Sequence, residues 1–138
     1  MTRPGRGFTL IELLIAVAIV SILAAIAYPS YRHQVLRSNR TDGYAALMAC
    51  AQAQERWFTK TNKYSDSVCG SSSPDGYYSI SIDQSACSTT LNCYTAVATA
   101  TSKGGQDDDD KCEKLTLNHL GQKGSSTADG TATTDCWR

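Results

Sequence analysis

An apolar run near the start of the chain limits what it can fold into. Residues 8–27 read FTLIELLIAVAIVSILAAIA, and only Thr9, Glu12 and Ser21 interrupt the apolar side chains. Twenty residues in an α-helix extend about 30 Å, the thickness of the hydrocarbon core of a bilayer. The run therefore predicts a transmembrane helix.

The flanks of this run predict its orientation. A short polar leader, MTRPGRG, precedes it and carries Arg3 and Arg6. Positive charge before an apolar run keeps that end in the cytoplasm, so the remainder of the chain is expected outside. The six cysteines agree, because an even number of cysteines in a short chain is typical of disulfides formed outside the cytoplasm.

A cleaved secretory signal is the alternative interpretation. Residues Ala25–Ala27 form a small-x-small cleavage site, and cutting there would release a domain that starts at Tyr28. Glu12 argues against this, because a carboxylate inside a hydrophobic segment is costly and usually has a function.

The segment from Gly7 to Tyr31, GFTLIELLIAVAIVSILAAIAYPSY, resembles the class III signal of type IV pilins and of type II secretion pseudopilins. The resemblance implies that a prepilin peptidase cuts between Gly7 and Phe8 and methylates the new N-terminus at Phe8. It makes Glu12 the fifth residue of the mature chain. In that family this glutamate pairs with the N-terminal amine of a neighbouring subunit. Such a pair offsets two desolvation costs and fixes the axial stagger between subunits.

The helical pattern continues beyond the membrane segment to about residue 60. Pro29 lies within it, and a kink is expected there because proline removes one backbone hydrogen bond. Apolar residues then recur at three- and four-residue steps and predict an amphipathic second half: Val35, Leu36, Tyr44, Leu47, Cys50, Trp57 and Phe58. The intervening charged residues predict the wet face, where arginines are solvated or pair with neighbouring subunits: Arg32, Arg37, Arg40, Glu55, Arg56 and Lys60.

The composition changes to Ser, Thr, Gly and Asp after residue 62. Alternating or β-branched stretches at residues 77–82, 94–100 and 115–118 predict three strands, with room for a fourth. Turn residues at 73–76 and 121–124 separate them. The expected fold is α+β: the type IV pilin fold, with a long N-terminal helix packed on a small antiparallel sheet. The expected divisions are a cleaved leader (1–7), a transmembrane or filament-core helix (8–27), the amphipathic half (28–61) and a globular β region (62–138).

So small a sheet needs covalent support, and the cysteines are expected to supply it. Six cysteines allow fifteen pairings. The preferred set is Cys50–Cys69, Cys87–Cys93 and Cys112–Cys136. Zinc binding is the alternative, but no two cysteines have C-x-x-C spacing. No metal and no cofactor are predicted.

Charge and motifs weigh against other functions. Thirteen basic and thirteen acidic residues give zero net charge, and residues 63–138 carry six basic against ten acidic residues, so nucleic acid is an improbable partner. No Gly-x-Ser-x-Gly motif is present, and no catalytic residue is predicted. The acidic run Asp107–Asp110 does not follow the EF-hand pattern for calcium and is expected to be a solvated loop.

Similarity to type IV pilins continues past the signal and is greatest to PilE-type minor pilins. The segments that carry it are residues 28–31 (YPSY), 40–43 (RTDG), 45–48 (AALM), 54–59 (QERWFT), 76–78 (GYY), 112–117 (CEKLTL) and 136–137 (CW). Relative to the usual four cysteines of that group, Cys87 and Cys93 are an addition.

The resemblance implies a structural subunit, not an enzyme. The subunit would polymerise into, or prime, a type IV pilus that supports twitching motility and adhesion. Its expected partners are other pilins, the prepilin peptidase and methyltransferase, the inner-membrane assembly platform and membrane lipid. It would span the bacterial inner membrane once, N-terminus in the cytoplasm, and become extracellular in the pilus. A major pilin or a type II secretion pseudopilin is the alternative.

Overall fold

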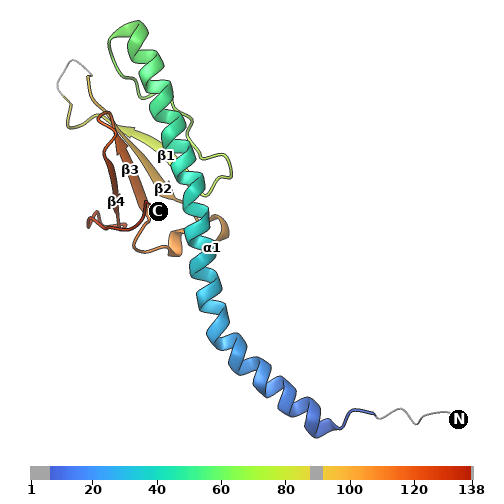
Figure 1. Ribbon diagram of the computed structural model, residues 1–138. Coiled ribbons are helices and arrows are strands. Elements are labelled where there is room, and N and C mark those ends of the chain that lie inside the picture. The colour runs from blue at the N-terminus through green and yellow to red at the C-terminus, as the bar shows by residue number, and fades with distance from the viewer. Residues whose placement is uncertain (1–6, 88–91, 138) are drawn as a thin grey trace, which may run out of the picture. The chain divides into compact units, whose positions relative to one another are not determined.

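The computed structural model describes residues 7–87 and 92–137, which form two compact units. The first unit ends at Val35 and the second begins at Leu36, so each is treated on its own. Helix α1, Leu10–Thr61, starts in the first unit and ends in the second. The strands follow it in the chain (Figure 1).

The first unit is the N-terminal part of α1. Its side chains are exposed almost throughout, and α1 is long and apolar enough to cross a membrane. The helix begins after Thr9, whose side-chain Oγ1 accepts a hydrogen bond from the Glu12 amide at 3.3 Å. Thr9 and Glu12 thus have the spacing of a capping box, with threonine at the N-cap and glutamate three residues later. The helix continues through Pro29, and the kink expected there stays a prediction.

The second unit contains one four-stranded antiparallel sheet in the order β1-β2-β3-β4 (Figure 1). Its strands are β1 (Tyr78–Asp83), β2 (Thr95–Ala100), β3 (Lys114–Asn118) and β4 (Lys123–Ser126). Each strand pairs with the next one in the chain. The topology is therefore a meander, in which each pair of neighbouring strands is joined by the segment of chain between them.

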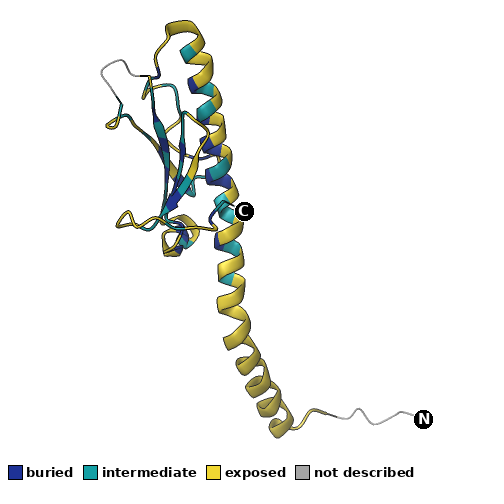
Figure 2. Cartoon of the chain, turned by 60° about the vertical axis from the view of Figure 1, so that its left-hand side comes forward, coloured by how far each residue is buried: buried dark blue, intermediate teal, exposed yellow. Residues whose placement is uncertain are grey.

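One face of α1 packs on one face of this sheet. Buried helix positions 42, 46, 50 and 54 recur every four residues, which places them along a single stripe. On the sheet, buried residues alternate along β1, β2 and β3: Tyr78, Ile80, Ala96, Ala98, Leu115 and Leu117. Figure 2 shows buried residues on the helix and on the strands where the two face each other. The core lies between these two layers.

Gly43 marks a close approach of helix and sheet. A Cβ added there would lie 3.0 Å from Tyr78 Cδ2 and 3.1 Å from Leu115 Cδ1. Both neighbours are fully buried, so they have little room to move away. The helix can approach the sheet this closely because position 43 has no side chain.

Three disulfides cross-link the second unit: Cys50–Cys69, Cys87–Cys93 and Cys112–Cys136. These are the pairs that the sequence analysis preferred. Closing loops of these sizes contributes about 2–4 kcal/mol each in the chain-entropy model. The last disulfide holds the C-terminal segment, where Trp137 stacks on Tyr44 of α1 and donates its indole N–H to the Gly124 carbonyl at 2.6 Å.

The predicted fold class is confirmed, with two corrections of detail. Residues 121–124 were expected to be a turn, but β4 begins at Lys123 because Leu117 and Lys123 face each other in the β3–β4 ladder. Trp57 was expected in the core, but it is 41% exposed. The buried stripe continues from Gln54 to the half-buried Phe58, and Trp57 lies beside that stripe.

Candidate functional site

The residues predicted for processing and assembly lie at the start of α1. Gly7, Phe8 and Glu12 are exposed, and Phe8 is 81% exposed. No residue that the structure describes donates a hydrogen bond to the Glu12 carboxylate. The remainder of the predicted leader, residues 1–6 with Arg3 and Arg6, lies outside the described residues.

The first unit presents an apolar surface on all sides of its helix. Its large exposed side chains are Phe8, Leu10, Ile11, Leu13, Leu14, Ile15, Val17, Ile19, Val20, Ile22, Leu23 and Ile26. An apolar surface of this extent needs lipid or similar helices around it. In either medium an ionised Glu12 needs a positive partner.

The second unit is anchored to α1 by an internal ion pair. Arg40 donates from Nε to Asp109 Oδ2 at 2.7 Å and from Nη2 to Asp109 Oδ1 at 2.8 Å. The two side chains are only 14% and 8% exposed. This hydrogen bond raises the pKa of the Arg40 guanidinium, so the arginine stays charged. Such a bidentate hydrogen bond fixes both the position and the orientation of the two side chains.

Gln106 extends this contact into the core. Its side-chain Nε2 donates to the Leu36 carbonyl at 3.2 Å and to the Tyr78 hydroxyl at 2.9 Å, and the same nitrogen lies 3.4 Å from Asp109 Oδ2. Burial raises the pKa of the Tyr78 hydroxyl above its usual value. The segment 103–109 is therefore bound both to α1 and to the first strand.

Two predictions about charged residues were wrong at this point. Arg40 was expected on the wet face, solvated or paired with a neighbouring subunit, and it pairs within the chain. Asp107–Asp110 was expected to be a solvated loop, but Asp109 is buried. No local pattern signals this pair, because 69 residues separate its members.

Asp42 is a second polar anchor on the buried stripe of α1. Its carboxylate accepts hydrogen bonds from the Ser73 hydroxyl, from the Asp75 amide at 3.0 Å and from the Tyr77 amide at 3.2 Å. Ser73 in turn accepts the Tyr78 amide at 2.9 Å. The helix thus holds the turn that leads into β1.

Gln54 is the third anchor, one turn beyond Cys50. Its amide donates to the Ser65 carbonyl and accepts the Ser65 amide at 3.1 Å, and it lies 3.6 Å from Cys69 Sγ. The residue is fully buried. Together with the Cys50–Cys69 disulfide it fixes the segment that follows the helix.

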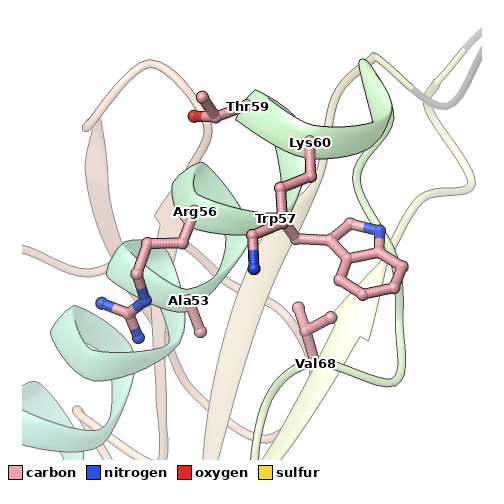
Figure 3. A pocket seen from close by; sticks show the side chains of 6 residues that line it. All are labelled: Ala53, Arg56, Trp57, Thr59, Lys60 and Val68. Carbon is pink, nitrogen blue, oxygen red and sulfur yellow. The ribbon is translucent and has the colours of Figure 1, made fainter.

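A surface hollow of about 460 Å³ lies beside the last turns of α1. It is lined by Ala53, Arg56, Trp57, Thr59, Lys60 and Val68. Figure 3 shows the Trp57 indole ring and Val68 on one side of the hollow and the Arg56 guanidinium on the other, with Lys60 reaching down between them. The hollow thus combines two cations with an apolar wall.

Potential metal ligands do not gather in the part of the chain that the structure describes: no group of three or more His, Cys, Asp or Glu side chains is placed to hold an ion. Two arrangements of the described residues are candidates for a functional role: the exposed apolar helix with Glu12 and the hollow lined by Arg56, Trp57 and Lys60.

Comparison with known families gives two matches along the chain. Residues 3–28 match the prokaryotic N-terminal methylation motif. Residues 29–116 match the family described as type IV minor pilin ComP, DNA uptake sequence receptor.

Curated relatives are similar over less than half of this chain. The type IV major pilin protein PilA of Myxococcus xanthus is 48% identical over 62 residues, which are 45% of this chain and 28% of that protein. The type IV major fimbrial protein FimA of Dichelobacter nodosus is 55% identical over 43 residues, 31% of this chain and 27% of that protein. The chain therefore matches less than a third of the length of either relative.

Solved structures are similar over more of the chain. A type IV pilin from Shewanella oneidensis has a TM-score of 0.53 and 26% identity, and the match covers 75% of this chain and 98% of that one. The non-core minor pilin PilV of Neisseria meningitidis has a TM-score of 0.54 at 15% identity, covering 73% and 96%. The second likeness concerns the fold alone.

Proposed function

Because the chain belongs to the type IV pilin family, we propose that it is a minor pilin that polymerises into, or primes, a type IV pilus. In this role prepilin peptidase cuts between Gly7 and Phe8 and methylates Phe8. The inner membrane then holds the subunit by the apolar part of α1, with the N-terminus in the cytoplasm, until the assembly platform transfers it to the filament. The filament would support twitching motility and adhesion.

The observation that carries this proposal is the exposed apolar helix with one carboxylate in its first turn. Helix burial in a filament replaces lipid contacts with helix contacts, so shape and polar pairing decide the geometry more than the hydrophobic effect does. Glu12 is then the residue that specifies stagger, by pairing with the N-terminal amine of an adjacent subunit.

The assignment to minor pilins rests on the family model that matches residues 29–116. The two relatives named above are major pilins, but each matches less than half of this chain. A major pilin remains the alternative, and a type II secretion pseudopilin the next.

Mass spectrometry of filaments sheared from the source bacterium tests the proposal. We expect a peptide that begins at N-methylated Phe8, from a chain present at about a few per cent of the main subunit. A dominant share would identify a major pilin instead. A mature chain that starts at Tyr28 and is missing from filaments would overturn the proposed function.

DNA binding is a second candidate, because the matched family is described as a DNA uptake sequence receptor. The charge of this chain weighs against it: residues 63–138 carry six basic and ten acidic side chains, and DNA binding depends on cations placed against phosphates. We expect the purified chain in detergent to bind a DNA duplex no more tightly than a membrane protein of equal charge. Salt-dependent binding to one sequence above others would favour the receptor role.

A further inference from the structure

The hollow beside the end of α1, lined by Arg56, Trp57 and Lys60, has no role in the proposed polymerisation through the apolar helix. Arg56 and Lys60 are four residues apart and so lie on the same face of α1. Neither forms an ion pair with another residue in the described ranges. Cations also suit the carbonyl end of a helix, but that does not explain why Trp57 beside them is left 41% exposed.

The chemistry of the hollow defines its ligand. Two cations select carboxylates or another anion, and the indole ring and Val68 offer an apolar wall against which the stem of a side chain can pack. Tryptophan and arginine, which both line the hollow, are also enriched in protein interfaces. A peptide segment that carries carboxylates fits both requirements.

The second unit also carries an acidic segment, residues 107–110, which lies beside a different part of α1 from the hollow. Asp107 and Asp110 are exposed, while Asp109 between them is held by Arg40. Arg40 and Arg56 are sixteen residues apart, about 24 Å along the helix axis. Figure 1 shows the 103–108 segment beside the middle of α1 and the end of α1 far from it within the second unit.

A contact between neighbouring subunits of a filament joins unlike surfaces, one from each subunit. A cationic hollow on one subunit and an acidic segment on the next suit such a contact. We propose that the hollow receives a carboxylate-bearing loop of the adjoining pilin subunit, of the kind that Asp107 and Asp110 present in this chain. This inference rests on the proposed function, since it needs the chain to be in a filament.

Site-specific crosslinking identifies what occupies the hollow. The full chain carrying Trp57→p-benzoylphenylalanine is produced in the source bacterium, the cells are irradiated, and crosslinked peptides from sheared filaments are sequenced. We expect a crosslink to an acidic segment of a pilin. Crosslinks that go only to lipid, to nucleic acid or to an uncharged segment, or no crosslink at all, would overturn the inference.

Charge reversal supplies an independent measurement. We expect Lys60→Glu to lower the amount of the chain in filaments about tenfold, because like charges then face each other in the contact. The matched control is Lys63→Glu, which makes the same change at an exposed residue outside the hollow. Both variants should keep the unfolding temperature of the original chain in detergent.

Two outcomes separate this inference from the proposed function. If the unaltered chain is missing from filaments, the proposed function fails. If the unaltered chain is present and Lys60→Glu enters as well as Lys63→Glu, only the inference about the hollow is wrong.

Discussion

The Glu12→Val chain is expected to be cut and methylated normally and yet to be at least about tenfold depleted in filaments. Valine suits the membrane segment better than glutamate does, so insertion is not expected to suffer. In the filament, however, the variant leaves the N-terminal amine of an adjacent subunit without its counter-charge. Breaking a buried ion pair from one side costs about 3–5 kcal/mol, which exceeds the 1.4 kcal/mol of a tenfold change.

Recovery of the chain in sheared filaments, relative to its amount in the membrane, measures this effect. Glu12→Gln is the control that separates two roles of the residue. Glutamine keeps a polar side chain of the same size at this position and removes only the charge. If Glu12 acts by pairing with an amine, Glu12→Gln should be depleted as Glu12→Val is. If Glu12→Gln enters filaments normally while Glu12→Val does not, a polar side chain is enough, and the pairing proposal is wrong.

The Asp109→Asn variant is expected to lose about 3 kcal/mol of the free energy of unfolding of the second unit. Its partner Arg40 is 14% exposed and would remain charged with its counter-ion gone. An uncompensated charge at a buried site costs about 3–5 kcal/mol, and the partial exposure of Arg40 favours the lower end. Urea unfolding of the full chain in detergent, followed by circular dichroism, measures the change.

Asp107→Asn is the matched control, because it makes the same substitution two residues away at an exposed position. A surface change of this kind should stay within about 0.5 kcal/mol of the original chain. The double variant Arg40→Met/Asp109→Leu should recover much of the loss, since removing both charges leaves neither of them buried alone. Equal stability of Asp109→Asn and Asp107→Asn would show that the ion pair does not stabilise the fold.

The layout of helix and sheet could be predicted from the sequence because it depends on local periodicity. Apolar residues that recur every three or four positions indicate a helix, and apolar residues at every second position indicate a strand. Both patterns can be read directly from the sequence. The same method failed for Arg40 and Asp109, because it assigns charged side chains to the solvent. What buries them is a partner 69 residues away, which no local pattern contains. Asp42 and Gln54 were overlooked for the same reason, as their partners belong to loops that follow the helix.

The sites at the N-terminus present the opposite case. Gly7 and Phe8 were found from a resemblance. Glu12 stood out already as a carboxylate inside an apolar run, and the resemblance supplied its partner. Their proposed roles require a peptidase and a neighbouring subunit. A single chain cannot show either contact. The hollow was unexpected because Trp57 follows the spacing of the apolar residues of the helix and was therefore assigned to the core. It is at the surface because it lies beside the buried stripe.

The lateral attachments of α1 have a mechanical consequence. Arg40, Asp42, Cys50 and Gln54 bind the helix to four separate points of the chain that follows it. They are spread over fourteen residues, about 21 Å of helix. A tensile force applied along the helix would therefore be shared among them as shear, and they would have to yield together and not one after another. A filament of such subunits could bear a high tensile force along its helices while each sheet stayed packed on its own helix.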